Sequence, residues 1–400
     1  MQNPSKASDS SGPTLECLVG LAVQGFRNLR NKYDPPEPCT QDATDTGTIP
    51  ADGRTSRGIL CDDLHSTLLP RLIDQLHTIL DLIGLESMQE DPESKLKRLL
   101  EIQSQLDFNI ARINSSFLDL CPKSLSTTNE QSNNQHLKQF KAYRLLEFKN
   151  DFFIALEEIC DLFGAADTWL DTSGFSRDSP WGSRHAMLTQ RVFDMLEVTI
   201  EQSKKTETDV IEHFATHALG GIDRQLGNLI SMLNPTSPLR YPFLSNFRHQ
   251  PIVDLATTLI PFIKLHQSFY KKLTKHGIMS CRTLPSFTQM NSHQLKSLCG
   301  SAERIAPRLE ELLMSLSQVD MNVRDRPVDI QHITEAVEHI ANSVIFSLVS
   351  VLLYLVPLID SVPEKNYYQG WFATWNAQIN IAVQNFVQLA EDLQEEDDLE

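Results

Sequence analysis

The sequence predicts an all-α protein made of two antiparallel helical bundles joined by a Pro-rich linker. Long stretches between prolines are filled by Leu, Ile, Gln, Glu and Lys, which lose little side-chain freedom in a helix. Within these stretches apolar residues recur at intervals of three and four, which is the period of an amphipathic helix. Runs of short alternating strands do not occur, and 400 residues suffice for two domains.

Residues 1–58 are predicted to form a peripheral helix followed by a disordered linker. Leu15 to Leu29 is amphipathic, whereas residues 31–58 are rich in Pro, Asp, Thr and Gly. The N-terminus lacks the apolar core of a signal peptide, which disfavours secretion. We therefore expect a loosely attached helix on a protein of the cytoplasm, the nucleus or both.

Residues 59–234 are predicted to form the N-terminal bundle. Three segments, near 64–83, 96–120 and 145–163, carry the helical apolar pattern, and 181–205 and 207–233 add two more helices. The stretch from Asn234 to Pro242 contains three prolines, which makes it the predicted domain boundary. Residues 235–395 then form the C-terminal bundle, and residues 396–400 form a mobile acidic tail.

Residues 340–359 carry no charge and have the length of a membrane span. Ser and Asn residues and Pro357 interrupt the segment, and no basic residue flanks it. A helix that is apolar all round can equally be the central helix of a large bundle. We expect a buried core helix, with membrane attachment as the alternative.

Charge and cysteine content narrow the class of protein. The formal net charge is −17, and such a chain is repelled by phosphate backbones, so we expect no nucleic-acid partner. The seven cysteines form no CxxC pair, which argues against a zinc ribbon or a disulfide framework and suits a reducing compartment.

The sequence contains no recognisable catalytic motif. Phosphate-binding glycine loops and the GxSxG nucleophile turn do not occur. His213 and His217 share a helix face, but the glutamate of the zinc-binding HExxH motif is missing between them. We predict no enzyme activity, no cofactor and no metal; a metal-dependent or small-molecule-binding protein is the alternative that these histidines leave open.

Aromatic residues cluster near the C-terminus, between Tyr367 and Trp375. Trp371 and Trp375 lie one helical turn apart, as do Tyr368 and Phe372. Aromatic residues at this spacing are usually core anchors, and a ligand platform is the alternative.

The region from Arg240 to Arg282 holds seven basic residues and a single acid, Asp254, within an acidic chain. Lys264, Lys271 and Lys275 fall on one face of the helix predicted there. Patches of opposite charge steer the encounter of protein partners, so these three lysines are the predicted partner-binding face. The alternative is that they neutralise acidic neighbours, such as residues 391–400.

The C-terminal half resembles the cyclin-D-interacting (GCIP-like) helical-bundle family. The similar stretches are Pro251 to Leu273, Leu295–Leu298, Glu303 to Leu312 with its internal proline, and Trp375 to Phe386. This resemblance implies an all-helical adaptor that binds regulators, with a cell-cycle role, and has no active site.

The whole chain is also similar to a lineage-expanded family of rust-fungal helical proteins. The residues that carry this similarity are Leu68-Leu69-Pro70 and the stretch Trp371 to Asn376. The similarity implies origin more than activity. Together, the sequence predicts a non-enzymatic intracellular adaptor or regulator whose partner is another protein.

Overall fold

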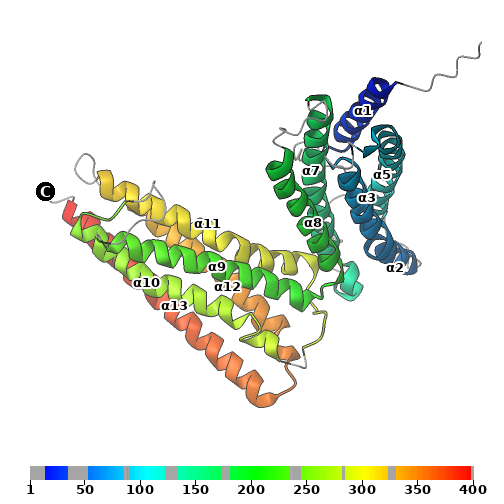
Figure 1. Ribbon diagram of the computed structural model, residues 1–400. Coiled ribbons are helices and arrows are strands. Elements are labelled where there is room, and N and C mark those ends of the chain that lie inside the picture. The colour runs from blue at the N-terminus through cyan, green and yellow to red at the C-terminus, as the bar shows by residue number, and fades with distance from the viewer. Residues whose placement is uncertain are drawn as a thin grey trace, which may run out of the picture. The chain divides into compact units, whose positions relative to one another are not determined.

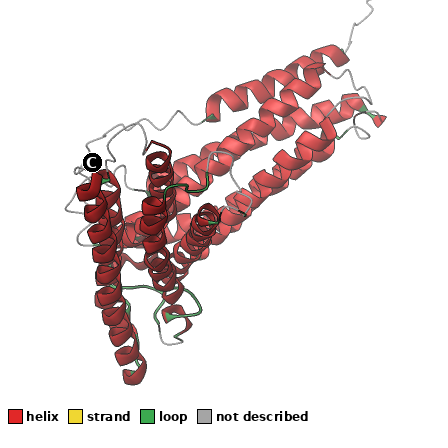
Figure 2. Cartoon of the chain, turned by 90° about the vertical axis from the view of Figure 1, so that its left-hand side faces the viewer, coloured by secondary structure: helices red, strands yellow, loops and turns green. Residues whose placement is uncertain are grey.

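The protein is helical throughout the part that the structure describes. The computed structural model describes residues 14–34, 53–84, 88, 90–121, 134–172, 181–234, 236, 245–281, 284–322 and 330–397. These residues form helices and turns and include no strand (Figure 2). The prediction of an all-α fold is confirmed. The chain divides into two units, one of residues Met1–Thr128 and Arg144–Lys204 and one of residues Asn129–Tyr143 and Lys205–Glu400.

This division differs from the boundary that the sequence suggested at 234/235. Helix α9 (Glu207–Leu233) belongs to the second unit because it packs along α10 (Gln250–Lys272) and α11 (Ser292–Asn322). The Pro-rich stretch 234–242 therefore connects two helices of one bundle and does not join the bundles. Single prolines also lie inside helices of this protein, Pro261 in α10 and Pro307 in α11, so proline content alone does not show where a domain ends.

The first unit is built around α5, against which α1, α2 and α3 pack. Its elements are α1 (Leu15–Tyr33), α2 (Gly53–Asp63), η1 (Leu64–Leu68), α3 (Leu69–Leu82), α5 (Pro92–Leu120), α7 (Ala142–Thr172, of which residues from 144 onward belong here) and α8 (Trp181–Lys204) (Figure 1). Aromatic contacts join α7 to this core, since the ring of Phe117 lies 4.9 Å from that of Phe148.

Helix α1 is an integral part of the first unit, which corrects the expectation of a loosely attached helix. Its apolar stripe is buried, with Phe26 fully inaccessible. The Gln103 side-chain amide donates to the Ala22 carbonyl at 2.9 Å, and the Tyr33 hydroxyl donates to the Asp107 carboxylate at 2.7 Å. A stripe with this spacing has to be covered by apolar residues, and α5 supplies them.

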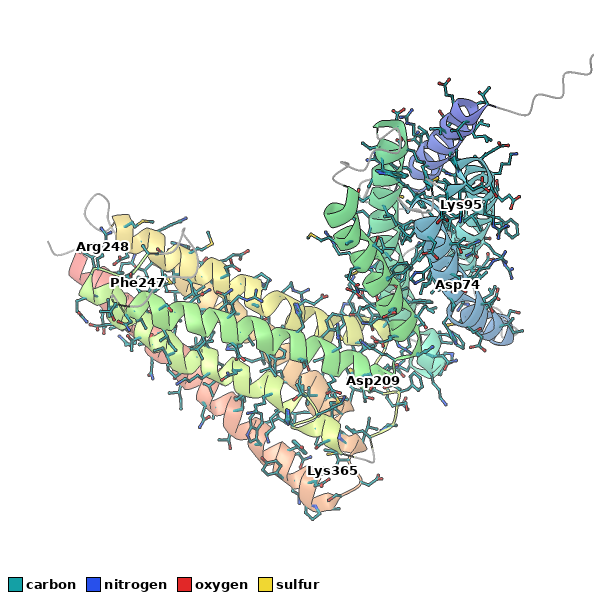
Figure 3. All side chains as sticks on the ribbon, in the orientation of Figure 1. Asp74, Lys95, Asp209, Phe247, Arg248 and Lys365 are labelled. Carbon is teal, nitrogen blue, oxygen red and sulfur yellow. The ribbon has the colours of Figure 1, made fainter. Side chains whose placement is uncertain are left out.

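The second unit is a ring of long helices around one apolar core. Helix α9 packs on α10 and α11, α12 (Gln331–Tyr354) packs on α11 and α13 (Val362–Asp397), and α13 closes the ring against α10 (Figure 1). Short 3₁₀ segments complete the unit: η2 (Gln135–Phe140), η3 (Ile278–Ser280) and η4 (Val356–Leu358). Arg248, just before α10, lies at the opposite end of the bundle from Lys365 near the start of α13, so α10 and α13 run antiparallel (Figure 3).

Helix ends in this unit are fixed by local side-chain contacts. Helix α9 starts with a capping box, in which the Thr206 hydroxyl accepts from the Asp209 backbone N–H and the Asp209 carboxylate accepts from that of Thr206. Before α10, the buried Asp320 carboxylate accepts from the backbone N–H groups of Arg248 and His249. These contacts satisfy donors that a helix start otherwise leaves without partners.

The apolar segment 340–359 lies on the perimeter of the ring and is not its central helix. One face of α12 is buried against α11 and α13, but the outer face exposes Phe346, Val349 and Leu353. Residues Gln331–Leu358 are long and apolar enough to cross a membrane. In their most apolar stretch of 18 residues, 44% is buried inside the protein. Core helices of soluble proteins can be equally long and equally apolar.

Two predicted segments fall largely outside the described residues. Of the predicted linker 31–58, residues 35–52 are not described, while α1 extends to Tyr33 and α2 begins at Gly53. Of the predicted tail, residues 398–400 are not described, and α13 continues to Asp397. The described ends of the linker and the described start of the tail are therefore helical.

Candidate functional site

A surface groove of about 980 Å³ runs between α10 and α13 of the second unit. Its wall on α13 is a single helical stripe, and its wall on α10 is shorter. The lining residues on α13 are Asn366, Tyr367, Gly370, Trp371, Thr374, Trp375, Gln378, Ile381, Ala382 and Asn385, and those on α10 are Pro261, Lys264, Leu265 and Ser268. The lining is therefore apolar and aromatic with neutral polar groups, one cation and no carboxylate.

The floor of the groove is rigid because it is part of the core. The Trp375 indole N–H donates to the Leu265 carbonyl at 2.8 Å, which joins α13 to α10. Behind it, the Trp375 ring lies 4.9 Å from that of Phe269, which also contacts Phe372. The prediction that these aromatic residues are core anchors is confirmed for Tyr368, Phe372 and Trp375, which are buried, whereas Trp371 is only half-buried.

Lys272 lies beside one end of the groove, against three aromatic rings of α13, of which Tyr367 and Trp371 line the groove. The Lys272 ammonium lies 4.9 Å from the ring centre of Tyr367, 5.7 Å from that of Tyr368 and 5.4 Å from that of Trp371. It also donates to the Tyr367 hydroxyl at 2.8 Å. Burial raises the pKa of Tyr368 to about 12, so this ring stays neutral. The cation is thus held by ring faces and a hydroxyl, and no described carboxylate pairs with it.

The structure separates the three lysines of the predicted basic face. Lys264 lines the groove and Lys271 is exposed two turns further along α10. Lys275 lies beyond the end of α10, where its backbone N–H donates to the Glu212 carboxylate at 3.2 Å and its ammonium lies 3.9 Å from the same group. Extrapolating the helical period past Lys272 placed Lys275 on a helix face that does not exist there.

Sequence reasoning missed Lys272 and the outer face of α13. From Asn366 to Ala390 the chain contains no Asp, Glu, Lys, Arg or His, although 22% of the whole chain is Asp, Glu, Lys or Arg. About half of the surface of this helix faces solvent, where charged residues are ordinarily common. Charged residues are depleted from the centres of protein interfaces, so an uncharged outer face is typical of a surface that another molecule covers. The absence of charge over residues 366–390 is the sequence signal that could have indicated this face.

The histidines His213 and His217 both lie exposed on α9. Burial lowers the pKa of His213, and the nearby charges of Lys205 and His217 lower it further. Among the described residues, no group of three or more His, Cys, Asp or Glu side chains is placed to hold a metal ion.

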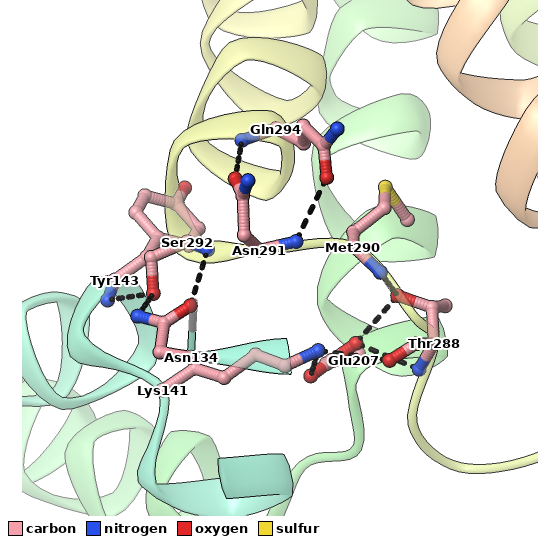
Figure 4. Close-up of polar contacts among 9 residues, drawn as sticks. All are labelled: Asn134, Lys141, Tyr143, Glu207, Thr288, Met290, Asn291, Ser292 and Gln294. Atoms are coloured by element: carbon pink, nitrogen blue, oxygen red, sulfur yellow. Dashed lines mark hydrogen bonds and ion pairs between the residues drawn. The ribbon is translucent and has the colours of Figure 1, made fainter. Parts of the chain in front are cut away.

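A second feature of this unit is a buried polar cluster beside the start of α9 and the turn before α11 (Figure 4). The Lys141 ammonium lies 2.6 Å from the Glu207 carboxylate, and both side chains are 0% exposed. The other Glu207 oxygen accepts from the backbone N–H and the hydroxyl of Thr288, each at 2.8 Å, and Lys141 donates to the Thr288 carbonyl.

The segment that carries Lys141 is held at a second point. The Asn134 side-chain amide donates to the Ser292 hydroxyl at 2.7 Å, and its carbonyl accepts from the Ser292 backbone N–H at 3.0 Å (Figure 4). The Ser292 hydroxyl also accepts from the Tyr143 backbone N–H. Residues 134–143 thus complete the second unit although they lie within the sequence of the first.

The fold and groove define a helical-bundle protein with an open apolar surface and a neutral rim on one side. Residues 57–206 match the family model described as Domain of unknown function (DUF8723), and residues 206–388 match that described as Domain of unknown function (DUF8721). The boundary of these matches coincides with the start of α9. No curated protein and no solved structure matches the chain.

Proposed function

We propose that this chain is a non-enzymatic protein-interaction adaptor that binds a helix of a protein partner in the groove between α10 and α13. The observation that carries this proposal is the groove itself: its floor is rigid and apolar, and its α13 wall carries no charge from Asn366 to Ala390. A rigid apolar groove between two helices is the geometry in which amphipathic helices dock.

The proposed setting of this adaptor is the cytoplasm or the nucleus. The six described cysteines are free thiols, which suits a reducing compartment. Neither nucleic acid nor a membrane is the proposed partner: the chain carries a net charge of −17, and α12 buries one of its faces against α11 and α13 as a member of the bundle. The proposed role beside cell-cycle regulators rests on the resemblance of the sequence's C-terminal half to the cyclin-D-interacting family.

Two glycines allow a matched test of this proposal. A Cβ added at Gly370, which lines the groove, meets no atom within 4 Å, and the same is true at Gly220 on α9, outside the groove. Gly370→Phe therefore fills the groove without disturbing the core, and Gly220→Phe adds the same ring elsewhere. Both changes remove a helical glycine, so neither is expected to destabilise its helix.

The measurement is affinity purification with mass spectrometry from native cells, using wild type and both variants. We expect at least one partner that wild type and Gly220→Phe retain and Gly370→Phe loses. If every specific partner survives Gly370→Phe, the groove is not the working surface and the proposal is wrong.

A further inference from the structure

The charge of the groove is confined to one of its edges. The α10 edge carries Lys264 in the lining, Lys271 exposed further along, and Lys272 at the end. The α13 edge is neutral over its whole length from Asn366 to Asn385. A docked helix therefore meets cations along one side only.

These cations have no ion-pair partner in the part of the chain whose side chains the structure describes. Among the described residues, Lys264 and Lys271 have no carboxylate within ion-pair distance, whereas Lys275 has Glu212. Lys272 is oriented by aromatic rings and the Tyr367 hydroxyl, which fix its position and leave its positive charge intact. In a chain of net charge −17, a row of uncompensated lysines beside an apolar groove is available to an acidic partner.

The wall on α13 also sets the length of the occupant. Asn366 and Asn385 bound the lined stripe, and at 1.5 Å per residue this stripe extends about 28 Å along the helix. A partner helix of about five turns covers that length. Its apolar side chains, spaced three and four apart, would meet Leu265, Trp375 and Ala382 on the floor.

We infer that the occupant of the groove is an amphipathic helix of about five turns with acidic residues along the edge that faces α10 and uncharged residues along the edge that faces α13. This inference rests on the proposed function and specifies the chemistry of its partner. The acidic edge lies beside Lys264 and Lys271 and ends near Lys272. Alignment of a partner's carboxylates with these lysines fixes the register and direction of the helix.

The test uses the full chain and two synthetic helical peptides of 19 residues with the same apolar face. One peptide carries Glu along one edge and the other carries Lys there; the remaining edge is Gln and Ala in both. Binding is measured by fluorescence anisotropy at low and high salt. We expect the Glu peptide to bind at least about tenfold more tightly than the Lys peptide, with a difference that shrinks as salt rises.

The matched variants reverse the edge charge. Lys264→Glu/Lys271→Glu should invert the preference of the two peptides, and Lys296→Glu, an exposed lysine of α11 outside the groove, should leave it unchanged. Gly370→Phe should abolish binding of both. Equal binding of the two peptides, or a preference that survives the double reversal, would overturn the acidic edge.

The inference and the proposed function fail in different ways. If neither peptide binds but a cellular partner is lost on Gly370→Phe, the groove is the working surface and the acidic helix is wrong. A concentration-dependent dimer in sedimentation analysis, lost in Gly370→Phe, would show that a second copy of this chain fills the groove and would also overturn the acidic helix. If Gly370→Phe loses no cellular partner, the proposed function itself is wrong.

Discussion

The buried polar cluster and the groove lie in the same helical unit, but they satisfy their side chains in opposite ways. In the cluster, the charges of Lys141 and Glu207 are fully buried and paired with each other and with Thr288. In the groove, Ile381 is 55% exposed and Lys264 has no carboxylate partner among the described residues. The cluster is complete within one chain, whereas the groove has surface that another molecule can cover.

This contrast teaches where the two kinds of effect should appear. A buried ion pair contributes to stability only while both partners are present, because either charge alone stays buried without compensation. The exposed lining of an open groove contributes little to folding, so its solvent-facing residues can be changed at small cost, unlike the buried floor at Trp375. Substitutions in the cluster should therefore change stability, and those in the groove should change binding.

The largest effect is expected for Lys141→Met. It leaves the Glu207 carboxylate buried without its cation, which costs about 3–5 kcal/mol of unfolding free energy. Denaturant unfolding of the full chain measures this loss, and the double variant Lys141→Met/Glu207→Met should recover much of it. Lys97→Met, which removes an exposed pair with Glu93, should cost under about 0.5 kcal/mol. If Lys141→Met lowers the unfolding free energy as little as Lys97→Met does, the cluster does not hold the unit together.

The next effect is a dependence of stability on pH, which we expect from the buried His266 side chain. Burial lowers the pKa of His266 from 6.5 to about 4, and its Nδ1 hydrogen-bonds the Phe262 carbonyl. The unfolded chain binds this proton first, so stability present above pH 6.5 is lost as the pH falls toward 4, by about 3 kcal/mol. The difference in unfolding free energy between wild type and His266→Phe, measured across this range, should follow that slope. A constant difference would contradict it.

A smaller effect is expected for Trp371→Ala, measured on binding. Trp371 is half-buried in the lining of the groove, and truncating a tryptophan that anchors an interface commonly costs about 2 kcal/mol, or roughly 30-fold in affinity. Affinity for a partner identified through the Gly370→Phe experiment is the measurement. The melting temperature serves as the control, because a large fall in it would place Trp371 with the core instead of the groove.

The smallest effect is expected for Gly370→Ala. The open space around this position and its helical conformation allow a gain of about 0.4–1 kcal/mol in unfolding free energy. Gly221→Ala is the contrasting variant, because an added Cβ there would lie 2.4 Å from Ala306 and should destabilise. If both variants respond alike, the groove at Gly370 is not open.

The sequence predicted the helices and most of the core, since the apolar period fixes which face of a helix is buried. It predicted the burial of Phe372 and Trp375 on α13 correctly. The apolar period does not predict the division into units. Helix α9 belongs to the second unit because of the helices that it contacts, and a Pro-rich connection has the same sequence pattern inside a bundle as between bundles.

The candidate site was predicted only in part. Lys264 was named as a binding residue and lines the groove, but Lys275 was placed by a helical period that ends at Lys272. The position of Lys272 over Tyr367 and Trp371 joins segments about a hundred residues apart, and no spacing rule relates them. The pairing of Lys141 with Glu207 could not be predicted for the same reason. It depends on the packing of residues 134–143 in the second unit, which no sequence spacing indicates.

The most direct measurement of the central claim is hydrogen–deuterium exchange of the full chain with and without its captured partner. Binding in the groove predicts slower exchange over residues 366–385 of α13 and 261–268 of α10, with the exposed face of α12 around Phe346 unchanged. Slower exchange on α12 alone, or in the first unit alone, would contradict the claim that the groove is the surface through which this protein works.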